Sequence, residues 1–191
     1  MARRDNPEIN AGSMADIAFL LLIFFLVTTT MDVDQGISRK LPEKQDPNVE
    51  PPNIKEKNIF DVLVNRNNEI LVQNEYVEIG DIRQMAKDFI DNGGGVDAEG
   101  NPCDWCNGAK DPESSDHPKK AVVSIESNRG TSYSTFISVQ NELVAAYNEL
   151  RDEYAKKKFG VLFNELSADR QKKIKDDIYP QIISERPPVK N

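Results

Sequence analysis

The longest run of apolar residues in the chain lies near its N-terminus. No polar side chain occurs from Ile17 to Val27, and the apolar segment as a whole covers the 21 residues 11–31. A helix of that length, at about 1.5 Å per residue, is roughly 31 Å long and matches the ~30 Å hydrocarbon core of a bilayer. A single span must be helical, because only a helix pairs its own backbone groups in lipid. The pattern therefore predicts one transmembrane helix.

Asp16 is the only ionisable residue in this segment. A charged carboxylate at the centre of a spanning helix costs about 2.5–3.5 kcal/mol, so its presence indicates a function. Two other interpretations stay open. Asp16 can lie at headgroup level in an ordinary helix N-terminus, where the helix dipole favours a negative charge. The segment can also be a cleaved signal peptide behind Arg3 and Arg4, although its Thr-rich end is a poor cleavage site.

The charges on either side of the span predict its orientation. Residues 1–10 carry Arg3 and Arg4, whereas Asp32 and Asp34 follow the span. Basic residues are retained in the cytoplasm, so residues 1–10 are expected to form a cytoplasmic stub, with the rest of the chain exported. In a Gram-negative cell the exported part would be periplasmic.

A proline-rich linker is expected to separate the span from a folded domain. Residues 32–57 contain four prolines and many charges, a composition typical of an extended spacer. Within it, Gln35–Pro42 can form a short strand that pairs with another segment. The folded domain, called the head below, is predicted over residues 58–186, and residues 187–191 form a tail.

Alternating and helical apolar patterns predict an α+β head. Its sheet is expected to have about three to five strands, packed by two main helices and a short C-terminal helix. The long helix is capped by Ser134 or Thr135 and stopped by Gly160. The expected segments are a hairpin over Ile59–Gln73, an extended piece beginning at Val77, a helix over Asp81–Asp91, a strand over Lys120–Glu126, a helix to Lys158, a helix from Ser167 to Ile178 and a strand over Gln181–Glu185.

Two groups of polar residues on these helices are expected to be accessible to solvent. Asp81, Asp88 and Asp91 form a charged face of the first helix, which solvation explains. The far end of the long helix carries Arg151 and Lys156–Lys158 and is too polar to be fully buried. It is expected to project from the head or to pair with a second copy.

An inserted loop, residues 93–118, interrupts the apolar periodicity of the head. Loops of this length inside a compact domain are usually functional or mobile. It contains the only two cysteines, Cys103 and Cys106, and the only histidine, His117. An oxidising compartment favours a disulfide, but a redox-active pair or a zinc site with His117 and an aspartate also remain open.

Composition limits the function classes. A net charge of −8 over 191 residues argues against nucleic acid as a partner, since phosphate binding needs a basic surface. With one histidine, no glycine-rich phosphate loop and no nucleophile–base pair at a recognisable spacing, the sequence predicts a protein that is not an enzyme and has no cofactor or metal.

The N-terminal motif resembles a known family. Ile9–Ile17 (INAGSMADI), an unbroken Leu/Ile/Phe run and a Thr-Thr-Thr end are similar to the start of the ExbD/TolR family of biopolymer transport proteins. The single span, the proline-rich linker and the small α+β head agree over nearly the whole length. The Ser-Met pair and the Thr-Thr-Thr end look most like ExbD proteins of Bacteroidota-type bacteria, whereas the 93–118 insertion and the 168–178 helix depart from the shorter family members.

The resemblance implies a proton-motive-force transducer in the bacterial inner membrane. Two copies of the span would lie inside a pentameric polytopic partner of the ExbB or TolQ type, and the intramembrane carboxylate at Asp16 would carry protons. The head would act on a TonB- or TolA-like protein or on peptidoglycan, and the Gln35–Pro42 segment would pair between two copies. On an ideal helix, the residues that share the face of Asp16 and are expected to face the proton path are Ser13, Leu20, Ile23, Val27 and Thr30.

Three alternatives remain at this stage. A TolR-like subunit would maintain the envelope rather than drive outer-membrane transport. A flagellar-type stator also has one span with an essential aspartate, but the head shows no peptidoglycan-binding motif of that class. In a membrane-anchored periplasmic adaptor or redox protein, Asp16 would be structural and Cys103 and Cys106 would be the working residues.

Overall fold

The computed structural model describes residues 11–28 and 54–186 as two separate units. The first unit is helix α1, Ala11–Thr28, and it is the only helix within the described ranges that is long and apolar enough to cross a membrane. Its last hydroxyl is paired within the helix, because Thr28 Oγ1 donates to the carbonyl oxygen of Phe24 at 2.8 Å. The predicted Thr30 and the Gln35–Pro42 strand lie outside the described residues.

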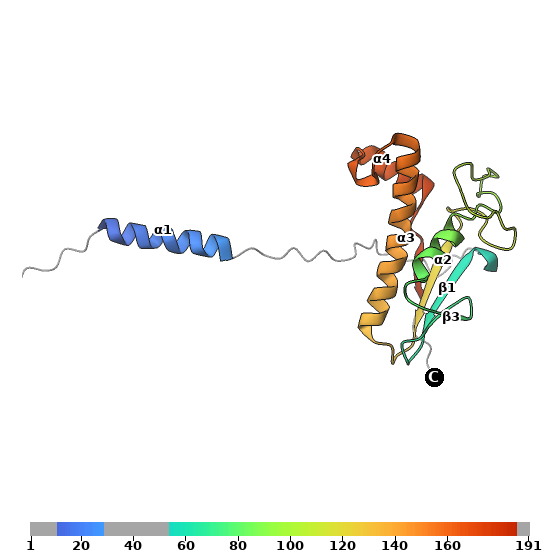
Figure 1. Ribbon diagram of the computed structural model, residues 1–191, viewed down its shortest axis with the longest axis horizontal. Helices are drawn as coiled ribbons and strands as arrows, with labels where there is room; N and C mark the ends of the chain where they lie inside the picture. Colours follow the sequence, from blue (N-terminus) through green and yellow to red (C-terminus); the bar gives the residue numbers. More distant parts are fainter. Residues whose placement is uncertain (1–10, 29–53, 187–191) are drawn as a thin grey trace, which may run out of the picture. The chain divides into compact units, whose positions relative to one another are not determined.

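The second unit is built on a five-stranded mixed sheet with the order β3-β2-β1-β4-β5 (Figure 1). The first three strands form an antiparallel meander, and β4 and β5 add to β1 in parallel. This confirms the predicted α+β fold, although the third strand ends at Val77 instead of beginning there. The strands are β1 Ile59–Val64, β2 Ile70–Val72, β3 Glu75–Val77, β4 Val122–Ser127 and β5 Ile183–Arg186.

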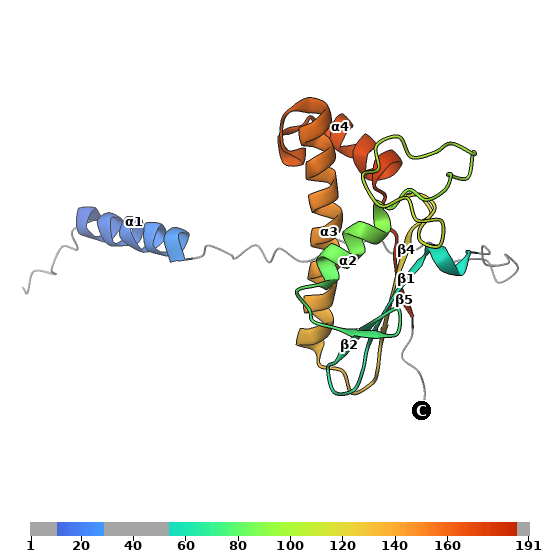
Figure 2. The ribbon, with the colours of Figure 1, turned by 45° about the vertical axis from the view of Figure 1, so that its right-hand side comes forward.

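Helices α2, Ile82–Ile90, and α3, Tyr133–Phe159, cover one face of this sheet (Figures 1 and 2). Alternate β1 residues point into the core between the layers, and Phe60, Val62 and Val64 are at most 2% exposed. Burying one such side chain stabilises the fold by about 1.5–3 kcal/mol. The alternate apolar residues of β1 and the apolar stripe of α3 therefore pack against each other in a single core.

The ends of α3 are set by two local signals. Ser132 has an extended backbone, and its Oγ accepts a hydrogen bond from Thr135 N at 3.2 Å. The predicted cap at Ser134 or Thr135 was thus wrong by two or three residues, because helical geometry already begins at Tyr133. At the other end Gly160 adopts a left-handed conformation with φ 75°, which favours glycine and terminates the helix as predicted.

The C-terminal part of the head folds back over the far end of α3. It consists of short helical elements, and it buries a second small core of Ala155, Leu166 and Ile174. The expectation that this end of α3 is too polar to be fully buried is confirmed for Lys156–Lys158, which are exposed, but it was wrong for Arg151, which is only 4% exposed. The elements are a 3₁₀ turn Phe163–Glu165, α4 Ala168–Lys173 and a π-helical turn Ile174–Ile178.

Candidate functional site

The carboxylate at Asp16 lies in the N-terminal third of α1. Ser13, Leu20, Ile23 and Val27 follow or precede it at alternating intervals of three and four residues, which places all five on one helix face. Every residue of α1 is exposed in this unit, so the helix offers its whole surface for packing. It remains a prediction that the Asp16 face lines a proton path and that Thr30 also lies on this face.

The chemistry available on α1 is limited to one group. Asp16 is its only ionisable side chain, and the residues around it are small or apolar. Asp16 is therefore the candidate site on this helix, and its role as a proton carrier stays a prediction.

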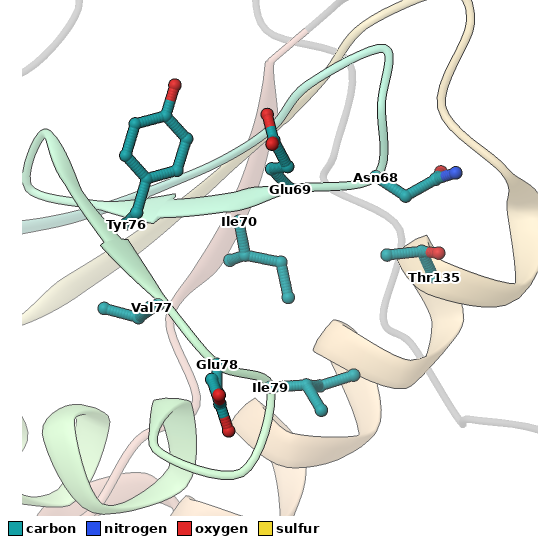
Figure 3. Close-up of a pocket in the computed structure, with 8 residues that line it drawn as sticks. All are labelled: Asn68, Glu69, Ile70, Tyr76, Val77, Glu78, Ile79 and Thr135. Atoms are coloured by element: carbon teal, nitrogen blue, oxygen red, sulfur yellow. The ribbon is translucent and has the colours of Figure 1, made fainter.

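A hollow of about 670 Å³ lies in the head between the β2–β3 hairpin and the start of α3. Figure 3 shows Ile70 and Ile79 directed into it, while Tyr76 and Glu69 project from the other side of the hairpin. Thr135 forms its α3 wall. The lining is mostly apolar and contains no nucleophile paired with a base, so this hollow has no catalytic constellation.

The inserted loop 93–118 carries a disulfide between Cys103 and Cys106. Both cysteines are at most 8% exposed, and sulfurs joined in this way are not thiolates available to zinc. No cluster of three potential metal ligands occurs within residues 11–28 and 54–186. His117 is fully buried, accepts the Lys119 N–H at Nδ1 at 3.1 Å and packs edge-on against Trp105. Burial lowers the pKa of His117 and favours its neutral form.

Buried polar side chains attach this loop to the end of α2. The Asn92 amide donates to the carbonyl oxygens of Ser115 at 2.7 Å and Asp111 at 2.9 Å. The Gly108 N–H donates to the Asp91 carbonyl oxygen at 3.1 Å. Sequence reasoning did not identify Asn92, which is 2% exposed, because it looked like part of a helix-breaking Asn-Gly run.

Asp91 connects three parts of the head. The expectation that it lies on a solvated helix face was wrong, because its side chain is buried. Its Oδ2 accepts the Asn107 N–H of the insertion at 2.9 Å, and its Oδ1 accepts the Tyr179 hydroxyl at 2.6 Å. Asp91 is 6% exposed and Tyr179 is 2% exposed. Burial raises the pKa of Asp91, and the hydrogen bond from Tyr179 opposes that rise.

A second buried carboxylate attaches the insertion to the start of the head. Asp116 lies 2.6 Å from Lys57 Nζ, and it exchanges side-chain and backbone hydrogen bonds with Asn58. Burial raises the pKa of Asp116, but Lys57 and Asn58 outweigh that effect and hold the pKa below its usual range. Lys57, the last residue of the predicted linker, is therefore in contact with the folded head.

The described residues thus combine one N-terminal helix, long and apolar enough to cross a membrane and carrying a single carboxylate, with a small α+β head. A family model described as "Biopolymer transport protein ExbD/TolR" matches residues 2–151, which include α1 and the head as far as Arg151. The chain belongs to the ExbD/TolR family, whose members are non-enzymatic, energy-transducing subunits of membrane motors. No curated protein matches the sequence significantly.

Proposed function

We propose that this chain is the proton-carrying subunit of an inner-membrane motor of the ExbB–ExbD type, which uses the proton motive force to drive TonB-dependent transport across the outer membrane. The single ionisable group of α1, Asp16, carries this proposal. Each proton that crosses 100 mV releases about 2.3 kcal/mol. A carboxyl group that alternates between its charged and neutral forms couples this energy to movement of the helix against its partner.

The arrangement of partners follows from this role. Two copies of α1 lie within a pentameric ExbB/TolQ-like protein, with the face that carries Ser13, Asp16 and Leu20 toward the proton path. Residues 1–10 are cytoplasmic, and residues 32–57 cross the periplasm as a linker. The head, residues 58–186, then engages a TonB-like protein and the cell wall. The Ser-Met pair and the Thr-Thr-Thr end of the N-terminal motif favour an ExbD protein of Bacteroidota type over a TolR protein.

Replacement of Asp16 by Asn tests the proposal. Asn has nearly the same shape as Asp, but its side-chain amide does not take up or release a proton at physiological pH. TonB-dependent uptake should therefore fall to the level of a strain without the protein. Asp16→Glu keeps the proton site and should restore part of the uptake. Asp32→Asn, which removes an acid just beyond the span, serves as the matched control and should leave uptake unchanged.

Three measurements on the same strains define the outcome. Immunoblotting of membranes should show equal amounts of each variant, and the polytopic partner should copurify with all of them. Uptake of an iron complex, compared with resistance to bile salts, separates the TonB role from a Tol-like envelope role. Wild-type uptake in the Asp16→Asn strain would refute proton handling by this residue.

A further inference from the structure

The far end of the head is basic although the chain as a whole is acidic. Residues 156–175 contain seven Lys or Arg residues and two Asp or Glu residues, whereas the whole chain has a net charge of −8. This stretch follows the part of the sequence matched by the family model, which ends at residue 151. The positive charge is therefore confined to the middle of a C-terminal extension, residues 152–186, which the family model does not cover and which has eight Lys or Arg and seven Asp or Glu over its whole length.

The extension encloses a groove of about 310 Å³ with an apolar floor and a cationic rim, called the basic groove below. Its volume is at the lower end of the roughly 300–1,000 Å³ typical of ligand pockets. The basic groove runs between the last turns of α3 on one side and α4 with the π-helical turn that follows it on the other. The floor is formed by Tyr154, Phe159 and Ile174, and the rim by Lys158, Arg170 and Lys173.

Two of the rim cations are held in place by the aromatic floor. The Arg170 guanidinium lies 5.1 Å from the centre of the Phe159 ring, and Lys158 Nζ lies 5.4 Å from that of Tyr154. Lys158 Nζ also lies within hydrogen-bonding distance of the Tyr154 hydroxyl, at 3.0 Å. Each such contact restricts the cation and leaves its remaining N–H groups available to an anion.

A second hollow, of about 430 Å³, continues the basic groove toward the inserted loop. It shares Tyr154 and Lys158 with the basic groove, and its other wall is formed by Asp104 and Trp105 of the insertion. Lys157 Nζ donates to Asn107 Oδ1 at 2.8 Å, which joins the insertion to α3 beside this hollow. Figures 1 and 2 show the insertion and the C-terminal helices at the same end of α3.

We propose that the basic groove binds an acidic segment of a partner protein, with an apolar side chain on the floor and flanking carboxylates on Lys158, Arg170 and Lys173. A carboxylate matches the planar fork of Arg170, which can donate two parallel hydrogen bonds. Aromatic residues and Arg are also enriched in protein interfaces. The proposal concerns a surface of the head and does not depend on the role of Asp16.

The same features disfavour a membrane surface as the occupant. Lipid insertion requires strongly exposed apolar side chains; Phe159 and Val161 at this tip are exposed at 36% and 38%, compared with 70% for Leu26 on α1. Arg170 lies over Phe159, and Lys175 lies over the Phe163 ring at 5.6 Å. Each of these two rings thus has a cation beside it, which insertion into the apolar interior of a bilayer would have to strip of water.

Fluorescence anisotropy with a defined peptide tests the proposal on the full chain in phosphatidylcholine nanodiscs. The probe is a fluorescein-labelled peptide with one Phe between Asp and Glu residues, and the control peptide carries Asn and Gln in their place. The acidic probe should bind at least tenfold more tightly than the control peptide. A variant with Lys158→Gln and Arg170→Gln should lose at least tenfold in affinity for the acidic probe.

A matched variant with Lys156→Gln and Lys172→Gln removes the same charge from the same stretch but leaves the basic groove intact. It should bind the probe within about twofold of the unmodified protein. Equal losses in the two double variants would show a diffuse charge effect and overturn the proposal. Loss of binding in discs that contain phosphatidylglycerol, without loss in phosphatidylcholine discs, would assign the surface to lipid headgroups and also overturn it.

Discussion

Tyr179→Phe should destabilise the head because it leaves a buried carboxylate with one donor fewer. The Tyr179 hydroxyl donates to Asp91 Oδ1 at 2.6 Å. Among the described residues, the other hydrogen bond to this carboxylate comes from the Asn107 N–H, at 2.9 Å. The Phe ring preserves the apolar burial of Tyr179. Arg151 is unaffected, because it donates to the backbone carbonyl of residue 179. The change therefore isolates one hydrogen bond.

The expected loss follows from the charge and burial of the acceptor. A hydrogen bond to a charged group contributes about 1.5–3 kcal/mol, and Asp91 is only 6% exposed, so solvent compensates little. A loss of about 2 kcal/mol corresponds to a melting temperature lower by roughly 4–8 °C in a domain of this size class. Urea unfolding of the full chain in detergent, followed by fluorescence of the single tryptophan, Trp105, measures the free energy of unfolding.

The loss should also depend on pH. Burial raises the pKa of Asp91 above its unfolded value, so this group favours the folded state most below the ordinary Asp pKa near 4. The favourable contribution is lost as the pH rises through the higher folded pKa. The Tyr179 hydroxyl limits that rise in pKa, so its removal makes the decline steeper. Tyr179→Phe should accordingly cost less at about pH 4 than at about pH 8.

Two further variants make this reasoning refutable. Asp91→Asn can keep both contacts, since its amide oxygen can accept from Asn107 and its NH₂ group can donate to the Tyr179 oxygen. It should flatten the pH dependence of stability. Tyr154→Phe removes a hydroxyl that accepts a hydrogen bond from the exposed Lys158, and it should cost less than about 0.5 kcal/mol. A Tyr179→Phe effect below that value, or one independent of pH, would refute the argument.

Two other predictions concern the inserted loop and use the same unfolding measurement. Lys57→Met should cost about 1–2 kcal/mol, less than for a fully buried pair because Lys57 is 30% exposed. Because the folded pKa of Asp116 is low, this cost should shrink as the pH falls below about 4, to the part contributed by the hydrogen bond from Lys57 to the Pro112 carbonyl oxygen. The same cost at every pH would contradict it. Removal of the disulfide by Cys103→Ser with Cys106→Ser should lower the free energy of unfolding by about 2 kcal/mol, the value that the chain-entropy model gives for so short a loop. TonB-dependent uptake should stay intact. Loss of uptake without loss of folded protein would instead favour a redox role.

The parts of the fold that sequence patterns predicted are those set by local periodicity. Phe60, Val62 and Val64 alternate within one strand, so their burial follows from the period of two alone. The apolar stripe of α3 and the end of this helix at Gly160 likewise follow from residues that are close together in the sequence. Asp16 was identifiable because a single carboxylate contrasts with an apolar helix.

Polar burial could not be predicted in the same way, because the partners lie far apart in the chain. Asp91 is separated from Tyr179 by 88 residues, and Asn58 from Asp116 by 58. When the distant partner is unknown, the sequence around each carboxylate predicts a solvated surface charge. Arg151 similarly depends on a backbone carbonyl 28 residues away. The local pattern predicted a helix and a strand in the C-terminal segment, but not that this segment folds back so that Tyr179 contacts Asp91 and Arg151.

The energies of the proposed proton step and of the head indicate how the two can be coupled. One proton crossing 100 mV supplies about 2.3 kcal/mol, which is comparable to a single buried charge-assisted hydrogen bond such as that between Tyr179 and Asp91. Domains of this kind unfold at a cost of about 5–15 kcal/mol, so one proton cannot unfold the head. If Asp16 carries the protons, their energy can move the head as a folded body or break one contact at its start, where Lys57 meets Asp116. Weakening that ion pair should thus alter coupling before it alters folding.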